Sequence, residues 1–144
     1  MSYAILDNNR FYAEGLRYAL LRRGVQPEVQ SDTVQWQPAL LTRRVVVVRC
    51  RFSVAGTHQA LINILLRLEA ARWQGSLYLV CNEKGWALAT HLRKRFSTLT
   101  LYIIDDRIAV ADAAYLLAKE PRRVRSLDNA LKKLNANNLL QLLL

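Results

Sequence analysis

Short apolar runs and longer segments with helical spacing alternate along the chain. The apolar runs have the length and composition of strands and fall at residues 3–6, 25–30, 45–48, 76–81 and 99–104. The segments between and after them carry apolar residues at helical spacing and fall at residues 9–23, 57–73, 84–96 and 108–119. This alternation predicts an α/β domain with a parallel sheet covered on both faces through right-handed crossovers.

Local signals set several of these boundaries. Gly24 is expected to stop the first helix, and Thr57 is expected to cap the helix that follows the third strand. A shorter helix through Leu41, capped by Ser31 or Asp32 and weakened by Pro38, is expected before the third strand.

The third apolar run, Val45 to Val48, has four β-branched residues in a row. This is the pattern of a strand buried on both faces, as in the middle of a parallel sheet. The run ends in Arg49-Cys50-Arg51. Because ligands of open α/β sheets bind beyond the carboxyl ends of the strands, Arg49 is a candidate site residue.

The end of the chain allows two interpretations. In the first, residues 1–120 form the domain, Pro121 interrupts the last helix, and residues 121–144 form a helical extension that serves as a dimerisation helix or a linker. In the second, residues 113–120 form the fifth strand and the helix opened by Ser126 is the fifth helix.

The extension has its own apolar pattern. Leu127, Leu131 and Leu134 lie at i, i+4 and i+7, which predicts one apolar face. That face is expected to dock either on the chain's own domain or on a partner. Dimerisation is expected equally through this helix or through the fourth and fifth elements of the domain.

The chain is strongly basic, with 21 Lys and Arg against 11 Asp and Glu and a net charge of +10. Such a balance suits an anionic partner such as nucleic acid. The candidate contacts are Arg93, Lys94, Arg95, Arg122, Arg123 and Arg125. Solvated helix faces and helix-end charges explain the same residues without a ligand.

Cys50 and Cys81 lie in apolar runs without metal-ligand spacing, which predicts buried free thiols in a reducing compartment, the cytoplasm. Neither residue lies in a nucleophile signature with His58 or His91, and no glycine-rich nucleotide motif occurs. No signal peptide or membrane-spanning run is encoded. We therefore expect no catalysis, metal or cofactor.

Residues 5–24, ILDNNRFYAEGLRYALLRRG, resemble the opening of response-regulator receiver domains. The likeness is to those attached to LuxR-type transcription factors, in particular the auxiliary capsule-regulator kind, where a strand ends in an acidic pair and a helix carries Glu-Gly-Leu. The resemblance implies a flavodoxin-like (CheY-like) three-layer α/β/α fold whose five-stranded parallel sheet has the order 2-1-3-4-5. An additional C-terminal helix is expected here.

The resemblance also implies where the family's chemistry would lie. Receivers hold magnesium with two acidic residues after the first strand, phosphorylate an aspartate after the third, and use Ser or Thr after the fourth and Lys after the fifth. By position these sites fall on Asp7 with Asn8, on Arg49, on Cys81 and on Asp105. Only Asp7 matches, so the chain resembles a degenerate receiver, a pseudo-receiver.

An arginine cannot form an acyl phosphate, and its fixed charge repels magnesium. We hypothesise that Arg49 pairs with Asp7 or Asp105 and locks the site in one state. Tyr102 occupies the position of the family's switch aromatic, and packing as an ordinary strand aromatic is an equal interpretation.

These features predict a non-phosphorylatable interaction and dimerisation module in bacterial transcriptional regulation. Its partner would be a second copy or another response-regulator-like protein, and DNA would be reached through a separate domain after residue 144. Direct nucleic-acid binding is the alternative function. Catalysis on a flavodoxin-like fold is a third, since the fold alone does not exclude it.

Overall fold

The computed structural model describes residues 2–30 and 36–119. Its strands are β1 (Tyr3–Leu6), β2 (Pro27–Gln30), β3 (Val45–Arg49), β4 (Ser76–Cys81) and β5 (Thr100–Asp105). Its helices are α1 (Arg10–Leu21), α2 (Thr57–Ala70), α3 (Trp86–Arg95) and α4 (Val110–Ala118), and two short 3-10 turns are η1 (Pro38–Thr42) and η2 (Glu83–Gly85).

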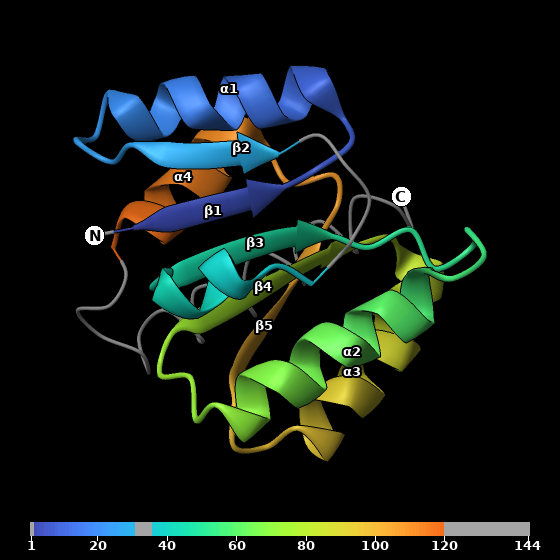
Figure 1. The fold of residues 1–144 in the computed structure, drawn as a ribbon. Coiled ribbons are helices and arrows are strands. Elements are labelled where there is room, and N and C mark those ends of the chain that lie inside the picture. The colour runs from blue at the N-terminus through green and yellow to red at the C-terminus, as the bar shows by residue number, and fades with distance from the viewer. Residues whose placement is uncertain (1, 31–35, 120–144) are drawn as a thin grey trace.

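All neighbouring strands run parallel, and the sheet has the order β2-β1-β3-β4-β5. The predicted flavodoxin-like sheet is therefore confirmed. Helices α1 and α4 cover one face of the sheet and α2 and α3 the other (Figure 1). Because the strands are parallel, their carboxyl ends meet at one edge of the sheet, where the residues after β1, β3, β4 and β5 lie together.

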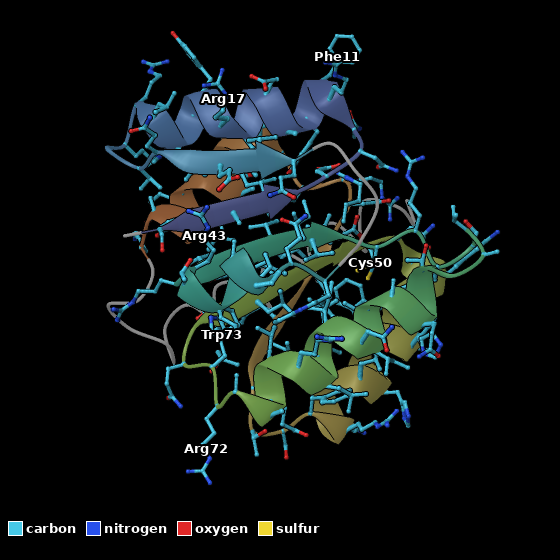
Figure 2. All side chains as sticks on the ribbon, viewed as in Figure 1. Phe11, Arg17, Arg43, Cys50, Arg72 and Trp73 are labelled. Carbon is cyan, nitrogen blue, oxygen red and sulfur yellow. The ribbon has the colours of Figure 1, made fainter. Side chains whose placement is uncertain are left out.

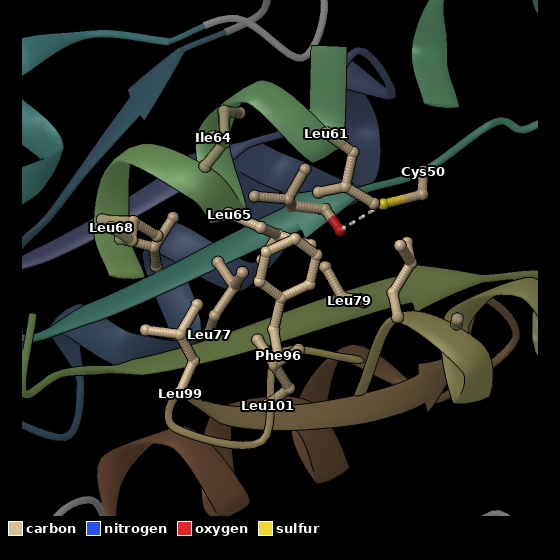
Figure 3. Close-up of a cluster of buried hydrophobic side chains, with 14 of the residues drawn as sticks. Cys50, Leu61, Ile64, Leu65, Leu68, Leu77, Leu79, Phe96, Leu99 and Leu101 are labelled. Carbon is tan, nitrogen blue, oxygen red and sulfur yellow. Dashed lines mark hydrogen bonds between the residues drawn. The ribbon is translucent and has the colours of Figure 1, made fainter. Parts of the chain in front are cut away.

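Side chains of each strand alternate between two hydrophobic layers. Val46 and Val48 pack toward α2 and α3, whereas Val45 and Val47 pack toward α1 and α4. All four valines are at least 96% buried, as the unbroken apolar run predicts. Figure 3 shows the layer below α2, where leucines of β4 and β5 surround Phe96.

Three predictions about helices were wrong. Thr57 is the first residue of α2 rather than its cap, because Gly56 before it takes the left-handed conformation with φ of 86°. The short helix expected through Leu41 is, in its described part, the 3-10 turn η1, with Pro38 at its start and Gln37 extended before it. The helix expected from Lys84 begins at Trp86, after the 3-10 turn η2.

The alternative that made residues 113–120 a strand was also wrong. These residues belong mostly to α4, whose buried side chains Ala113, Leu116 and Leu117 recur at helical spacing against the sheet. The Tyr3 hydroxyl donates to the carbonyl of Leu117 at 2.8 Å and so links this helix to β1.

The extension 121–144, with Arg122, Arg123, Arg125 and its leucines, lies outside the described residues. Across residues 2–30 and 36–119, no helix combines the length and apolarity needed to span a bilayer.

Candidate functional site

The carboxyl edge of the sheet holds an ion pair between Arg49 and Asp7. Leu6 lies opposite Val48 in the ladder, so the residues that follow them are neighbours. Arg49 Nε donates to Asp7 Oδ1 at 2.7 Å, and only 8% and 4% of the two side chains are exposed. The backbone N–H of Asn9 donates to the same oxygen at 2.8 Å. Of the two partners we hypothesised for Arg49, the structure shows Asp7.

Tyr12 on α1 covers the guanidinium of Arg49. The guanidinium carbon lies 4.9 Å from the centroid of the Tyr12 ring, within the range of a cation–π contact. The Tyr12 hydroxyl donates to the carbonyl of Ile108 at 3.0 Å, which fixes the ring. Burial raises the pKa of Tyr12 to about 12, although Arg49 acts in the opposite direction. The phenol therefore stays neutral, and its ring shields the ion pair from water.

Asp105 pairs with an arginine of its own loop. Its side chain is fully buried, and it accepts from the backbone N–H of Arg107 at 2.8 Å and from Arg107 Nε at 3.2 Å. Arg107 Nη2 also donates to the second carboxylate oxygen, Oδ2, at 3.2 Å. The two buried carboxylates at this edge, Asp7 and Asp105, are thus each bound by a different arginine.

Cys81 and Cys50 are buried thiols. Burial raises the pKa of Cys81 to about 12, with Asp106 and Asp105 adding to the effect, and it raises the pKa of Cys50 still further. Cys50 Sγ donates weakly to the Val48 carbonyl at 3.7 Å (Figure 3). Thiols held in the protonated form are poor nucleophiles, which fits a structural role for both.

Two further predicted site residues, Asn8 and Tyr102, have different environments. Asn8 is exposed. Tyr102 is 2% exposed and stacks on Tyr78, with their ring centroids 4.8 Å apart. It belongs to the hydrophobic layer below α1 and α4, so the structure shows it as a core aromatic.

The edge does not fit the magnesium that receiver chemistry uses. Asp7 Oδ1 already accepts from Arg49, and the place of the second carboxylate is taken by the exposed amide Asn8. A cation beside the Arg49 guanidinium would be repelled. Among the described residues, no three His, Cys, Asp or Glu side chains are grouped to hold a metal ion.

A pocket of about 350 Å³ opens at this edge. Its lining comes from the loops after β1, β3, β4 and β5 and comprises Asn9, Arg49, Cys50, Arg51, Ser53, Asn82, Asp106 and Arg107. Of these residues, the sequence analysis predicts only Arg49 as part of the site. Each of the others comes within a few positions after a predicted strand, and this placement could have identified it as a candidate lining residue.

The basic residues of α3 lie apart from this pocket. Arg93, Lys94 and Arg95 form the last turn of the helix, where positive charge interacts favourably with the helix dipole. The Arg95 guanidinium carbon lies 5.2 Å from the ring centroid of Phe96. Lys94 and Arg95 are exposed, whereas Arg93 is half-buried.

No protein-family model matches the chain, and no curated protein sequence matches it. Solved structures do. A receiver domain of a response regulator from Clostridium thermocellum has a TM-score of 0.58 at 12% identity, over 92% of this chain and 98% of that one. The signal receiver domain of a putative LuxO repressor protein from Vibrio parahaemolyticus has a TM-score of 0.59 at 8% identity, over 96% and 95%.

A designed Rossmann 2x3 protein has a TM-score of 0.62 at 11% identity, over 85% of this chain and 93% of that one. The structures of a designed protein and of natural receiver domains thus match this chain about equally well. The structural similarity therefore shows the fold and carries no information about activity. The chain has the fold of receiver domains.

Proposed function

We propose that the chain is a non-phosphorylatable receiver-like module that acts by protein–protein association in bacterial transcriptional regulation. The observation that carries the proposal is the buried Arg49–Asp7 pair. The position where receivers carry the phosphorylated aspartate holds Arg49, which forms no acyl phosphate. Its Nε donates to Asp7 Oδ1, on the carboxylate that would help to hold the metal in a receiver. The site is therefore held in one state without phosphoryl transfer, and activity depends on the amount of protein and its partner.

The same chemistry supports the absence of catalysis. Cys50 and Cys81 are the strongest nucleophiles by residue type near this edge, and burial keeps both protonated. Asp7 and Asp105 are bound by arginines at distances of 2.7 to 3.2 Å. No group of this set is left as a free base or nucleophile.

An association surface is offered by α1. Phe11 is 94% exposed and Tyr18 63%, and their spacing of seven residues places them on one face of the helix, with Leu21 nearby. Phe11 points away from the body of the molecule (Figure 2). Large apolar side chains exposed on one helix face mark an interaction site. We infer that a second copy or another receiver-like protein packs on this face.

The second candidate function is direct nucleic-acid binding. The net charge of +10 and the exposed Lys94 and Arg95 at the end of α3 favour it. An electrostatic interface of this kind loses affinity steeply as salt rises.

Sedimentation velocity separates the two candidates. The purified chain is run over a range of concentrations at low and physiological salt, alone and with a short DNA duplex. We expect a concentration-dependent dimer whose sedimentation the duplex does not change. A monomer shifted by the duplex at low salt only, with the shift lost in a Lys94→Gln, Arg95→Gln variant, would favour nucleic-acid binding instead.

A further inference from the structure

The pocket at the carboxyl edge is lined mainly by hydrogen-bond donors. We propose that it binds a phosphate group, as the free dianion or as a monoester, reversibly and without covalent transfer. This inference does not depend on the association proposed above, because the pocket and the exposed face of α1 share no residue.

The first argument is an unpaired donor on an arginine of the pocket lining. Arg49 Nη2 is buried and makes no hydrogen bond with the described part of the chain, whereas Nε of the same guanidinium is bound to Asp7. The side chain is 92% buried and lines the pocket. A buried N–H without an acceptor is destabilising. An oxygen of a bound anion that reaches Nη2 would supply the acceptor.

The two asparagines of the lining are oriented by backbone groups. Asn9 Oδ1 accepts from the N–H of Tyr12 at 3.2 Å, and Asn82 Oδ1 accepts from the N–H of Gly85 at 3.0 Å. A backbone N–H only donates, so this contact identifies the oxygen of each side-chain amide and therefore also its NH₂ group. Each asparagine thus has an NH₂ group that can donate to a ligand in the pocket.

The rim adds two positively charged arginines and a serine hydroxyl as further hydrogen-bond donors. Arg51 is exposed, Arg107 is 42% exposed while bound to Asp105, and Ser53 contributes a hydroxyl. Among the described residues of the lining, Asp106 is the one acidic side chain. The lining thus has three arginines against one carboxylate, which complements a dianion, and arginine binds phosphate oxygens well because of its forked geometry.

The volume sets the size of the ligand. About 350 Å³ lies at the lower end of the range for small-molecule pockets, so it admits a phosphate with a small organic group. In the described part of the lining, Cys50 is the one residue without a strongly polar side chain. A large apolar ligand would therefore leave these donors without acceptors.

Isothermal titration calorimetry of the full chain at fixed ionic strength tests the inference. Inorganic phosphate and glycerol 3-phosphate are the probes, and glycerol is the uncharged control. The variants are Arg51→Gln and Asp106→Asn, with Arg44→Gln as the matched control because Arg44 lies at the opposite end of β3. Arg49→Lys keeps the charge beside Asp7 and removes Nη2, and circular dichroism checks that it folds.

We expect saturable binding of at least one phosphate probe and none of glycerol. Arg51→Gln should weaken it about tenfold, the loss of one charge-assisted hydrogen bond, and Asp106→Asn should tighten it. Tighter binding of inorganic phosphate would identify the free anion, and tighter binding of glycerol 3-phosphate a monoester. The inference is overturned if neither probe saturates, or if Arg44→Gln weakens binding as much as Arg51→Gln, since net charge alone would then account for it.

Discussion

Arg49 and Asp7, which are 42 residues apart in the sequence, meet at 2.7 Å through Nε and Oδ1 with both side chains almost fully buried. The contact joins the ends of two adjacent strands and lies under the ring of Tyr12. A buried ion pair of this kind need not stabilise more than apolar residues would, but loss of one partner leaves an uncompensated charge. Removal of either partner alone would therefore leave a buried charge at this edge of the sheet without its counter-ion.

Removing one partner should destabilise the fold. Arg49→Met leaves the Asp7 carboxylate buried without its cation, and we expect the free energy of unfolding to fall by about 3–5 kcal/mol. Chemical denaturation measures it. The control is Arg17→Met, which breaks the exposed pair with Glu14 and should cost about 1 kcal/mol or less. Equal losses in the two variants would show that the buried pair has no special role.

Close packing at Gly75 predicts a second effect on stability. A methyl group at this position would lie 2.2 Å from a ring carbon of Trp73 and 2.6 Å from the carbonyl oxygen of Arg44. We expect Gly75→Ala to lower the free energy of unfolding by about 1–3 kcal/mol through overpacking.

A matched glycine should behave in the opposite way. In Gly15→Ala, the added methyl on α1 meets Val110 at an ordinary 3.5 Å, and alanine favours the helix by about 0.5–1 kcal/mol. Denaturant midpoints of the two variants should therefore move in opposite directions. A stable Gly75→Ala protein would contradict the packing around Trp73.

The buried thiol of Cys81 predicts a loss of stability in alkali. Its pKa rises from 9.0 to about 12 on folding, so between these values the unfolded chain loses a proton that the native state keeps. The native state then binds more protons, and the free energy of unfolding falls as pH rises past 9. Denaturation at pH 7 and roughly pH 10 measures the slope. Cys81→Ala should give a shallower decline, and an unchanged slope would show that this thiol does not contribute.

The α1 face should control self-association. Phe11→Ser removes an exposed ring, so we expect the monomer to stay folded and the dimer dissociation constant to rise about tenfold or more. Leu66→Ser, on the opposite side of the sheet and 44% exposed, is the control and should leave the constant unchanged. Sedimentation equilibrium compares them. A dimer weakened by Leu66→Ser and not by Phe11→Ser would move the interface to α2.

The fold was predictable because its signals are local and repeated. A strand such as Val45–Arg49 is recognisable in the sequence as an apolar run. The right-handed crossovers between parallel strands then restrict the possible strand orders. The starts of α2 and α3 were less predictable, because Gly56 in the left-handed conformation precedes α2, and a 3-10 turn capped by Asn82 precedes α3.

The site was predictable only in outline. Asp7, Arg49 and Asp105 each follow or end a strand, so their convergence at one edge could be expected. The partner of each arginine depends on tertiary position. Asp7 follows β1, which lies beside β3, whereas β4 separates β3 from β5, where Asp105 pairs with Arg107 of its own loop. Tyr12 was missed for a similar reason, since its ring reaches Arg49 only through the orientation of α1.

Acetyl-phosphate labelling with magnesium, followed by intact-mass spectrometry, tests the central claim most directly. We expect neither the wild-type chain nor Arg49→Asp to gain a phosphoryl group. In the variant a carboxylate stands at the acceptor position, but Asn8 and Asp105 still occupy the places of a metal-binding carboxylate and the lysine. Robust magnesium-dependent labelling of the wild-type chain would contradict the account, and labelling of Arg49→Asp alone would show that the rest of the receiver chemistry is intact.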